Sequence, residues 1–334
     1  LHKGYQLMMH HLTRRRMILA SAAALAPLGA RAQAQPAWAG TAARLDQLHA
    51  LVVTRGGAQA FGRAFRGPAL DRPVNVKSVS KTIVALLTGI AIDRGVLDGP
   101  DQPVLPILGR AAFGDARDTL TIGNLLTMQS GLASTSGANY GAWVNSRDWV
   151  DYVLANPSGR PGGNFIYSTG GWHVLGAALA RASGESLLTL ARDWLAGPLD
   201  IAMPPWVRDP QGRYLGGNDM ALSPLALARI GDMALGGGQI GGERVVSKAW
   251  LDTSWQPRAR SPFSGDQYGY GWFLTRFGGH DAAYARGYGG QMLAVVPALR
   301  MSVAITSDPT RPARGEGHFG DLRRLVDEIA RNPA

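Results

Sequence analysis

The chain has 334 residues, of which 46% are hydrophobic and 17% charged, a composition typical of a globular protein with a large core. The formal charge is +10, but residues 1–34 contain five basic residues and no acidic one, so the remainder carries only +5. This charge is scattered rather than clustered, which argues against a nucleic-acid-binding protein. The absence of cysteine excludes disulfides, thiolate metal sites, a cysteine nucleophile and a lipid anchor on cysteine.

The N-terminal segment has the pattern of an export signal. An arginine pair, Arg14-Arg15, precedes a short apolar stretch over 17–28, and small-residue cleavage sites end at Ala32 and Ala34. The apolar stretch is too short for a permanent membrane anchor. We therefore predict a twin-arginine-type signal peptide over 1–34 and a periplasmic or secreted mature protein.

The mature chain begins with elements that predict strands and then a long buried helix. A short helix is expected over 41–49, and two strands over 48–54 and 58–65 are expected around Gly56-Gly57. The long helix begins near Ser78 and ends at Gly95. Further helices are expected over 119–128, 149–154, 172–181, 186–196 and 223–235.

The last third of the chain changes character. Strand-like segments cover 268–277, 282–288, 291–296 and 301–307, and a closing amphipathic helix covers 319–331. Strands at both ends with helices between them predict an α+β domain over 40–334, with one antiparallel sheet built from both termini. One lobe would then be formed by about 40–70 and 240–334, and a mostly helical lobe by about 78–235.

A serine and a lysine lie one helical turn apart at the start of the long helix, in the segment Ser78-Val79-Ser80-Lys81. A buried lysine amine can take the proton of a serine hydroxyl, because desolvation lowers its pKa. Only four of the 34 basic residues are lysines, and arginine cannot serve as a base, so a lysine at this position favours chemistry. The alternative is a serine that caps the helix, followed by a solvated lysine.

Three motifs in the right order resemble those of the serine β-lactamases and penicillin-binding proteins. The first is Ser78-Val79-Ser80-Lys81, the second is Tyr167-Ser168-Thr169, and the third is Tyr288-Gly289-Gly290 followed by Gln291. Connecting segments over 120–132 and 268–272 are similar as well. The nearest resemblance is to the class C-like branch, with its DD-peptidases, family VIII-type esterases and 6-aminohexanoate-dimer hydrolases. This resemblance implies a β-lactamase/transpeptidase-like fold.

The resemblance also implies roles for these residues. Ser78 would attack an acyl carbon, and Lys81 with Tyr167 would move the proton. The backbone N–H groups of Ser78 and Gln291 would form the oxyanion hole. Gly289 and Gly290 would let the substrate approach the strand closely. Alternatively, Tyr167 is an ordinary core or surface aromatic, and Gly289-Gly290 is a simple hairpin turn.

Two of the expected substrate-binding positions depart from the family pattern. Thr169 stands where asparagine is usual, and Tyr288 replaces the lysine or histidine that holds a carboxylate. Both changes favour an esterase or amidase acting on a small ester, amide or peptide-like molecule. A DD-peptidase or weak class C-like β-lactamase is the alternative enzyme, and a non-catalytic penicillin-binding sensor module is the alternative of another class.

Other kinds of site find no support in the sequence. No Gly-x-Ser-x-Gly motif of an α/β-hydrolase and no phosphate-binding glycine loop occurs. The histidines of the mature chain lack ligand spacing, so a structural or exposed position is expected for His49, His173, His280 and His318. The sequence therefore predicts neither a metal nor a cofactor, and it does not predict the oligomeric state.

Overall fold

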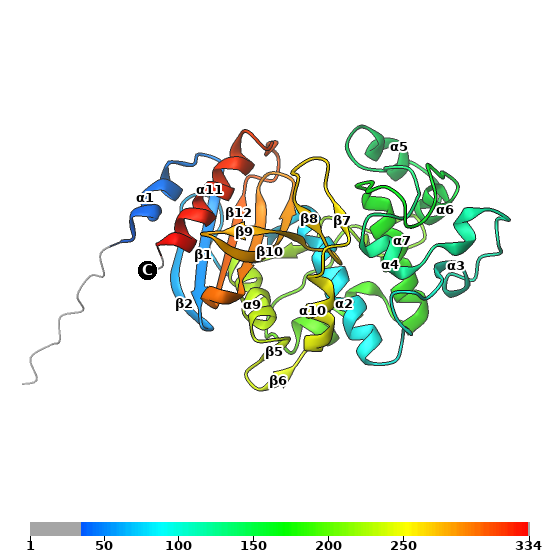
Figure 1. Ribbon diagram of the computed structural model, residues 1–334, viewed down its shortest axis with the longest axis horizontal. Coiled ribbons are helices and arrows are strands. Elements are labelled where there is room, and N and C mark those ends of the chain that lie inside the picture. The colour runs from blue at the N-terminus through cyan, green and yellow to red at the C-terminus, as the bar shows by residue number, and fades with distance from the viewer. Residues whose placement is uncertain (1–34, 333–334) are drawn as a thin grey trace, which may run out of the picture. The chain divides into compact units, whose positions relative to one another are not determined.

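The computed structural model describes residues 35–332, and the predicted signal peptide over 1–34 lies outside this range. Its largest element is an eight-stranded sheet whose paired strands are all antiparallel (Figure 1). The order is β2-β1-β12-β11-β10-β9-β8-β7, so the first and last strands of the chain are neighbours. This confirms the predicted α+β fold with a sheet built from both termini. The strands are β1 (Leu48–Arg55), β2 (Ala58–Ala64), β7 (Ala259–Arg260), β8 (Gln267–Tyr268), β9 (Phe273–Phe277), β10 (His280–Gly287), β11 (Gln291–Val296) and β12 (Met301–Ser307).

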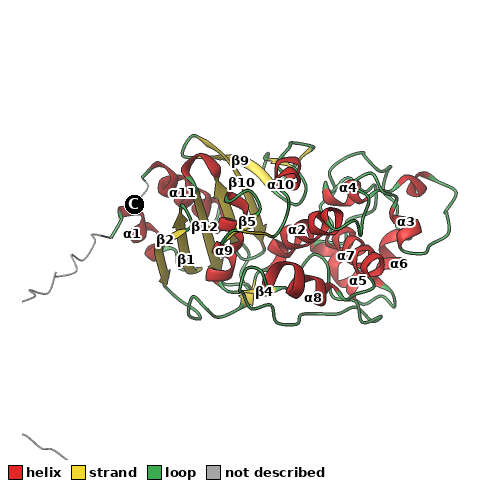
Figure 2. Cartoon of the chain, turned by 90° about the horizontal axis from the view of Figure 1, so that it is seen from below, coloured by secondary structure: helices red, strands yellow, loops and turns green. Residues whose placement is uncertain are grey.

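The middle of the sheet is buried on both faces. Every residue of β11 and β12 is buried, which requires that other elements cover the sheet on each side. Helix α11 (His318–Arg331) contacts α1 (Ala37–Arg44) and β9, and α9 (Pro224–Leu235) packs on β1, β11 and β12. The two helices lie on opposite faces of the sheet (Figure 2). The predicted inward face of the closing helix is confirmed by four buried residues, Leu322, Leu325, Val326 and Ile329.

Helix α9 corrects the predicted lobe boundary. We expected residues 78–235 to form the helical lobe, but α9 lies directly on the sheet. The approach is close because Gly231 has no side chain: a Cβ there would come 2.6 Å from Ser302 Cβ on β12. The chain therefore returns to the sheet before α9.

The helical lobe is built around α7 (Thr169–Ser183), which contacts α2, α3, α4, α6 and α8. Helix α2 (Ser80–Asp93) is buried from Ser80 to Ala91, so it forms the core that joins the lobe to the sheet. Helix α7 ends at Gly184, whose φ of 74° suits glycine. The remaining elements are α3 (Val104–Ile107), α4 (Ile122–Leu126), α5 (Tyr140–Val144), α6 (Trp149–Leu154), α8 (Leu187–Leu190), α10 (Lys248–Ser254), β3 (Val74–Asn75), β4 (Ala221–Leu222), β5 (Gln239–Ile240) and β6 (Glu243–Arg244).

Three predicted elements have different bounds in the structure. The expected helix over 41–49 is α1, which ends at Arg44 because β1 begins at Leu48. The periodic segment 119–128 yields only α4. The expected strand over 268–277 is interrupted at Gly271, where φ is 76° and the carbonyl accepts a 2.6 Å hydrogen bond from Thr82 Oγ1 of α2. This interruption ties the sheet to the helix that follows Ser78.

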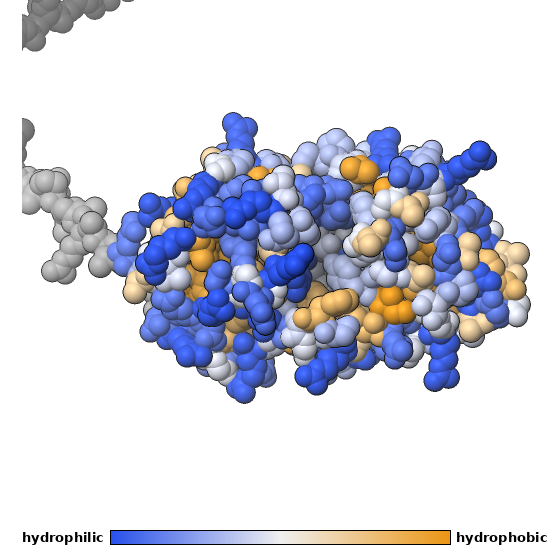
Figure 3. All heavy atoms as spheres, turned by 90° about the horizontal axis from the view of Figure 1, so that it is seen from above, coloured by the Kyte–Doolittle hydropathy of each residue, from blue (hydrophilic) through white to orange (hydrophobic). Residues whose placement is uncertain are grey.

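The surface of the described part is mostly polar. In the view of Figure 3, hydrophilic residues cover most of the face, and hydrophobic residues form small separate patches. Among residues 35–332, no helix is long and apolar enough to cross a membrane.

Candidate active site

Ser78 lies in a tight turn that leads into α2. The turn is a 3-10 helix over Lys77–Val79, and Lys77 adopts a left-handed φ of 51° that is uncommon for a residue with a side chain. The Lys77 N–H donates to Asn75 Oδ1 at 2.8 Å, and the Ser80 hydroxyl donates to the Lys77 carbonyl at 2.6 Å. These bonds fix the conformation of the turn and leave Ser78 half-buried at the start of the helix.

The Lys81 amine is enclosed by oxygen atoms. The residue is only 2% exposed, and Nζ lies 2.9 Å from Ser78 Oγ, 3.2 Å from Thr169 Oγ1 and 2.6 Å from the Gly217 carbonyl oxygen. Burial lowers the pKa of Lys81, and the neighbouring Tyr167 and Asp219 only partly oppose this shift. Lys81 is thus not a solvated lysine, and its amine is in position to exchange a proton with Ser78.

Tyr167 approaches the same amine from the segment that precedes α7. Its ring centroid lies 5.0 Å from Lys81 Nζ, and the side chain is half-buried. The Ser134 hydroxyl donates to the Tyr167 carbonyl at 2.7 Å and so anchors the backbone at this position. The structure brings the predicted trio of Ser78, Lys81 and Tyr167 together.

Thr169 does not lie where a substrate-binding residue should. It is 4% exposed, and its hydroxyl bonds Lys81 Nζ and lies 3.0 Å from Ser136 Oγ. The Thr169 N–H also donates to Ser136 Oγ at 2.9 Å. The predicted contact with substrate is therefore corrected: Thr169 holds the lysine from inside the lobe.

The turn between β10 and β11 corrects the predicted positions of Gly289, Gly290 and Gln291. Gly289 and Gly290 have φ values of 83° and 97° and are buried against other segments: Cβ atoms there would come 2.3 Å from the Asp308 carbonyl oxygen and 2.7 Å from the His318 ring. Gln291 is fully buried, and its side chain bonds the backbone of Ser307. The recorded contacts of these side chains and glycines are with β12, α11 and the segment after β12, which agrees with the hairpin-turn interpretation.

Gly287 is the glycine that lies against the Ser78 turn. A Cβ on Gly287 would come 2.4 Å from the Val76 carbonyl oxygen and 3.0 Å from Lys77 Cβ. The Gly287 carbonyl accepts from the Gly290 N–H at 3.2 Å, so its backbone groups face β11. N–H groups alternate sides along a strand, so the N–H of Tyr288 faces the edge of β10 opposite to β11. On that edge the pairing with β9 ends at Tyr284, before Tyr288 is reached. Tyr288, whose side chain is exposed, thus replaces Gln291 as the candidate oxyanion donor.

A loop that the sequence analysis did not identify completes the surroundings of Ser78. Gly217 supplies its carbonyl to Lys81, and Asp219 Oδ1 accepts from Lys77 Nζ at 3.2 Å and from Asn75 Nδ2 at 2.7 Å. The Met220 N–H donates to Ser80 Oγ at 3.1 Å. Two sequence features could have pointed to this loop: the rare lysine at 77 and the pair of glycines before Asn218. Neither belongs to a motif that predicts a site.

Other polar groups of the described residues have their own partners away from Ser78. His173 is fully buried, and His318 is half-buried with Nε2 3.0 Å from Ser307 Oγ. Arg286 stacks on Phe319 of α11, 3.6 Å from its ring centroid. Among residues 35–332, no group of three histidine or acidic side chains could hold a metal ion.

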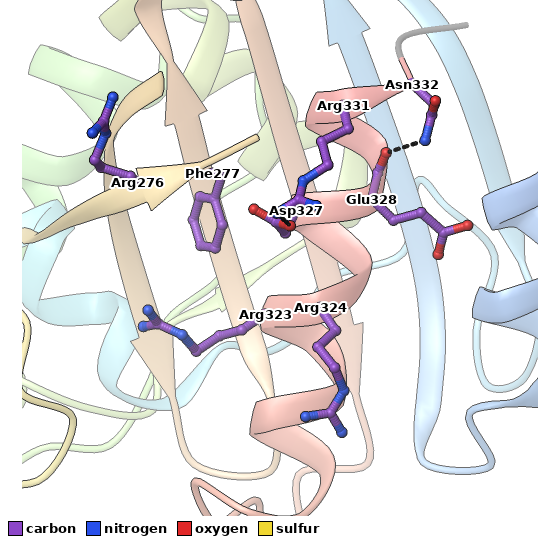
Figure 4. Close-up of a pocket in the computed structure, with 8 residues that line it drawn as sticks. All are labelled: Arg276, Phe277, Arg323, Arg324, Asp327, Glu328, Arg331 and Asn332. Carbon is purple, nitrogen blue, oxygen red and sulfur yellow. Dashed lines mark hydrogen bonds and ion pairs between the residues drawn. The ribbon is translucent and has the colours of Figure 1, made fainter. Parts of the chain in front are cut away.

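A surface hollow of about 470 Å³ lies between α11 and the end of β9 (Figure 4). Its lining includes Arg331 and Asp327, which pair with each other at 2.7 Å, and Arg276 and Arg323, which pair with Asp281 and Asp266. The hollow contains no residue of the Ser78 site, and each arginine of its lining is already paired with an aspartate.

Comparison with known proteins agrees with this geometry. The model of the Beta-lactamase family matches residues 41–326. The 6-aminohexanoate-dimer hydrolase of Paenarthrobacter ureafaciens is 25% identical over 316 residues, which cover 84% of this chain and 79% of that protein.

Two solved structures share the fold. The octameric penicillin-binding protein homologue from Pyrococcus abyssi has a TM-score of 0.67 at 19% identity, over 88% of this chain and 77% of that one. A family VIII carboxylesterase has a TM-score of 0.65 at 17% identity, over 83% and 91%. With the family model matching most of its length, the chain belongs to the β-lactamase family, within the superfamily of serine β-lactamases and penicillin-binding proteins.

Proposed function

We propose that the protein is a serine hydrolase that forms an acyl-enzyme on Ser78, and that its substrates are small carboxylic esters or amides. The observation that carries this proposal is the 2.9 Å contact between Ser78 Oγ and the buried Lys81 amine, with Tyr167 beside it. A nucleophile within hydrogen-bond distance of a base that is itself held by other groups is the arrangement that covalent catalysis needs.

In the acylation step, Ser78 Oγ bonds to the acyl carbon and its proton passes to the Lys81–Tyr167 pair. The N–H groups of Ser78 and Tyr288 would stabilise the oxyanion that forms. As the bond to the leaving group breaks, the pair returns the proton to the departing oxygen or nitrogen. In deacylation, a water molecule attacks the acyl carbon, the pair takes its proton, and Ser78 is released with its proton restored.

Esters and amides are favoured over β-lactams by what surrounds the nucleophile. Tyr288 provides no cation for a substrate carboxylate, and the hydroxyl of Thr169 is already bonded to Lys81. The names of similar proteins support this class, since one is a 6-aminohexanoate-dimer hydrolase and another a family VIII carboxylesterase. A DD-peptidase or a weak β-lactamase is the second candidate, because the first two motifs of that superfamily supply Ser78, Lys81 and Tyr167.

Covalent labelling and turnover together test the proposal. A fluorophosphonate should label the wild-type protein on Ser78 and leave Ser78→Ala unlabelled, and the same variant should lose turnover while unfolding at the wild-type temperature. A panel of p-nitrophenyl esters, nitrocefin and a D-Ala-D-Ala peptide would then rank the substrate classes. A wild-type protein that takes up no label and turns over no member of the panel would support a non-catalytic binding module instead.

We also propose that the protein is exported through a twin-arginine signal, which leaves it in the periplasm or outside the cell. The support is the Arg14-Arg15 pair followed by a short apolar stretch and small-residue cleavage sites. Replacing both arginines by lysine should retain the precursor in the cytoplasm. Mature periplasmic protein made from that variant would point to another route.

A further inference from the structure

We propose that His173 is a positioning residue for Lys81, acting through the backbone of the loop 209–217. This inference rests on the proposed role of Lys81 as a base. His173 Nδ1 accepts a hydrogen bond from the Gly216 N–H at 3.3 Å, and the next residue, Gly217, presents its carbonyl oxygen to Lys81 Nζ at 2.6 Å. His173 makes no recorded hydrogen bond to Ser78, and its effect on the reaction would pass through the backbone of Gly216 and Gly217.

The hydrogen bonds define the form of the imidazole. Because Nδ1 accepts from a backbone N–H, it carries no proton, and the proton of the neutral ring is on Nε2. Nε2 lies 3.0 Å from Asp209 Oδ2 and donates to it. The ring is fully buried and packs against both Trp143 and Trp149, whose centroids lie 5.9 Å and 5.4 Å away. Asp209 thus selects the tautomer that can hold Gly216.

Asp209 is itself fixed at both oxygen atoms. Oδ1 accepts from the N–H groups of Gln211 and Arg213 at 2.9 Å and 2.8 Å, and Oδ2 accepts from Arg213 Nη1 at 3.2 Å. Burial alone would raise the pKa of Asp209, but these donors and His173 lower it overall, so the carboxylate stays charged. Arg213 also pairs with Asp148 at 3.3 Å, so one cation links Asp209 to a second carboxylate.

The two glycines of the loop lie directly against the backbone of α7. A Cβ on Gly216 would come 2.3 Å from the Trp172 carbonyl oxygen, and one on Gly217 would come 2.7 Å from Trp172 Cβ. In this proposal the hydrogen bond to His173 sets where the loop lies along α7, so that losing the acceptor moves the Gly217 oxygen relative to Lys81 Nζ. The groups that face this amine are Ser78, Tyr167, Thr169, Gly217 and Asp219.

Two substitutions separate the two bonds of the imidazole. His173→Asn keeps an acceptor near the position of Nδ1 and loses the contact with Asp209. His173→Gln keeps a donor near the position of Nε2 and loses the contact with Gly216. Thr54→Val is the matched control, because it removes a partly buried hydrogen bond from β1 to Asp232 of α9, away from Lys81.

The readout is the pH profile of p-nitrophenyl ester hydrolysis. A carbonyl acceptor favours the charged amine, so loosening it lowers the pKa of Lys81. We expect His173→Gln to shift the acidic limb of kcat/KM to lower pH and to reduce kcat by roughly tenfold to a hundredfold with little change in KM. His173→Asn and Thr54→Val should keep the wild-type limb. If His173→Gln does not fold, Asp209→Asn replaces it, because an amide at 209 can favour the tautomer that cannot accept from Gly216.

An unchanged acidic limb in His173→Gln, at any rate of turnover, overturns the inference. A limb that shifts equally in His173→Asn and His173→Gln also overturns it, because the effect would then not depend on the Gly216 contact. Failure of the proposed function is distinct, since in that case the wild-type protein itself would neither hydrolyse the ester nor take up the fluorophosphonate label.

Discussion

Lys81 Nζ is held between Ser78 Oγ of the turn before its helix and the Gly217 carbonyl of a distant loop, at 2.9 Å and 2.6 Å. Two residues after Gly217, Asp219 pairs with Lys77 on the other side of Ser78. One loop therefore contacts both lysines that flank the nucleophile. The α2 helix supplies the one-turn spacing of serine and lysine, and the loop sets where the amine points.

Lys81→Arg should abolish most of the activity although it preserves the charge. The side chain is buried among three oxygen acceptors, and a guanidinium neither fits this space nor gives up its proton. Loss of a general base costs on the order of 10²–10⁴-fold in kcat. Lys248→Arg is the matched control, since Lys248 is exposed and pairs only with Asp252 on the same helix. Near-normal ester hydrolysis by Lys81→Arg would reduce Lys81 to an electrostatic role.

Thr169→Val should lower kcat and leave KM nearly unchanged. The change removes the hydroxyl that contacts Lys81 Nζ and Ser136 Oγ but preserves the shape of the side chain. We expect kcat to fall about tenfold, because the loss of one hydrogen bond that stabilises the transition state costs about 1.4 kcal/mol. Thr88→Val removes a buried hydroxyl of α2 that bonds only within the helix and serves as control. A rise in KM without a change in kcat would return Thr169 to the substrate-binding residues.

Gly287→Ala should damage the site more than the fold. The added Cβ would come 2.4 Å from the Val76 carbonyl oxygen and would push the Ser78 turn away from β10. We expect the rate of fluorophosphonate labelling to fall by roughly a hundredfold, since small displacements of reacting groups cost about this much. Gly141→Ala, where a Cβ meets nothing within 4 Å, is the control for the substitution itself. Labelling at the wild-type rate in Gly287→Ala would show that the turn does not depend on this contact.

Acid should destabilise the protein partly through His318. Burial lowers the pKa of His318 from its ordinary value of 6.5, and the carboxylates of Asp321 and Asp46 only partly oppose this, while Arg311 and His49 add to it. The unfolded chain then binds a proton at higher pH than the folded chain does. The resulting stability is complete above about pH 6.5 and is lost as the pH falls toward the lower folded pKa. Urea unfolding across this window should show a smaller fall for His318→Gln; equal falls would exclude His318 as a contributor.

The motif residues on regular elements could be predicted, and those on turns could not. Ser78 and Lys81 follow from helical spacing, and the sheet follows from the alternation and apolar runs of its strands. The predicted roles of Gln291 and of the two glycines before it assumed that the strand continues past Gly287. The residue at which a strand ends decides which backbone groups face the neighbouring segment, and the sequence does not show that end. β10 ends at Gly287, so Gly289 and Gly290 lie in the turn.

Contacts across long stretches of sequence were also beyond prediction. The Gly217 carbonyl is a backbone group, so no residue type marks its contact with Lys81 across 136 positions. Thr169 was assigned to substrate from the family pattern, whereas its burial depends on how α7 packs on α2. The position of α9 on the sheet depends on the absence of a side chain at Gly231, which its apolar periodicity does not reveal.

The exposed side chain at Tyr288 should set the preference between neutral and anionic substrates. It lies next to Gly287, which contacts the Ser78 turn, and it offers no cation to a carboxylate. A charge-assisted hydrogen bond is typically worth about 1.5–3 kcal/mol, or roughly tenfold to a hundredfold in kcat/KM. We therefore expect p-nitrophenyl acetate to be hydrolysed with a higher kcat/KM than nitrocefin.

Tyr288→Lys should shift this ratio toward nitrocefin by roughly tenfold or more without changing the unfolding temperature, because position 288 is 54% exposed. Tyr288→Phe is the control that keeps the ring and adds no charge, and it should leave the ratio near that of the wild type. The shift should shrink at high salt if it arises from charge. Thr169→Asn, in contrast, should not help, since position 169 is buried against Lys81 and Ser136. A wild-type preference for nitrocefin by a wide margin would contradict this account of Tyr288.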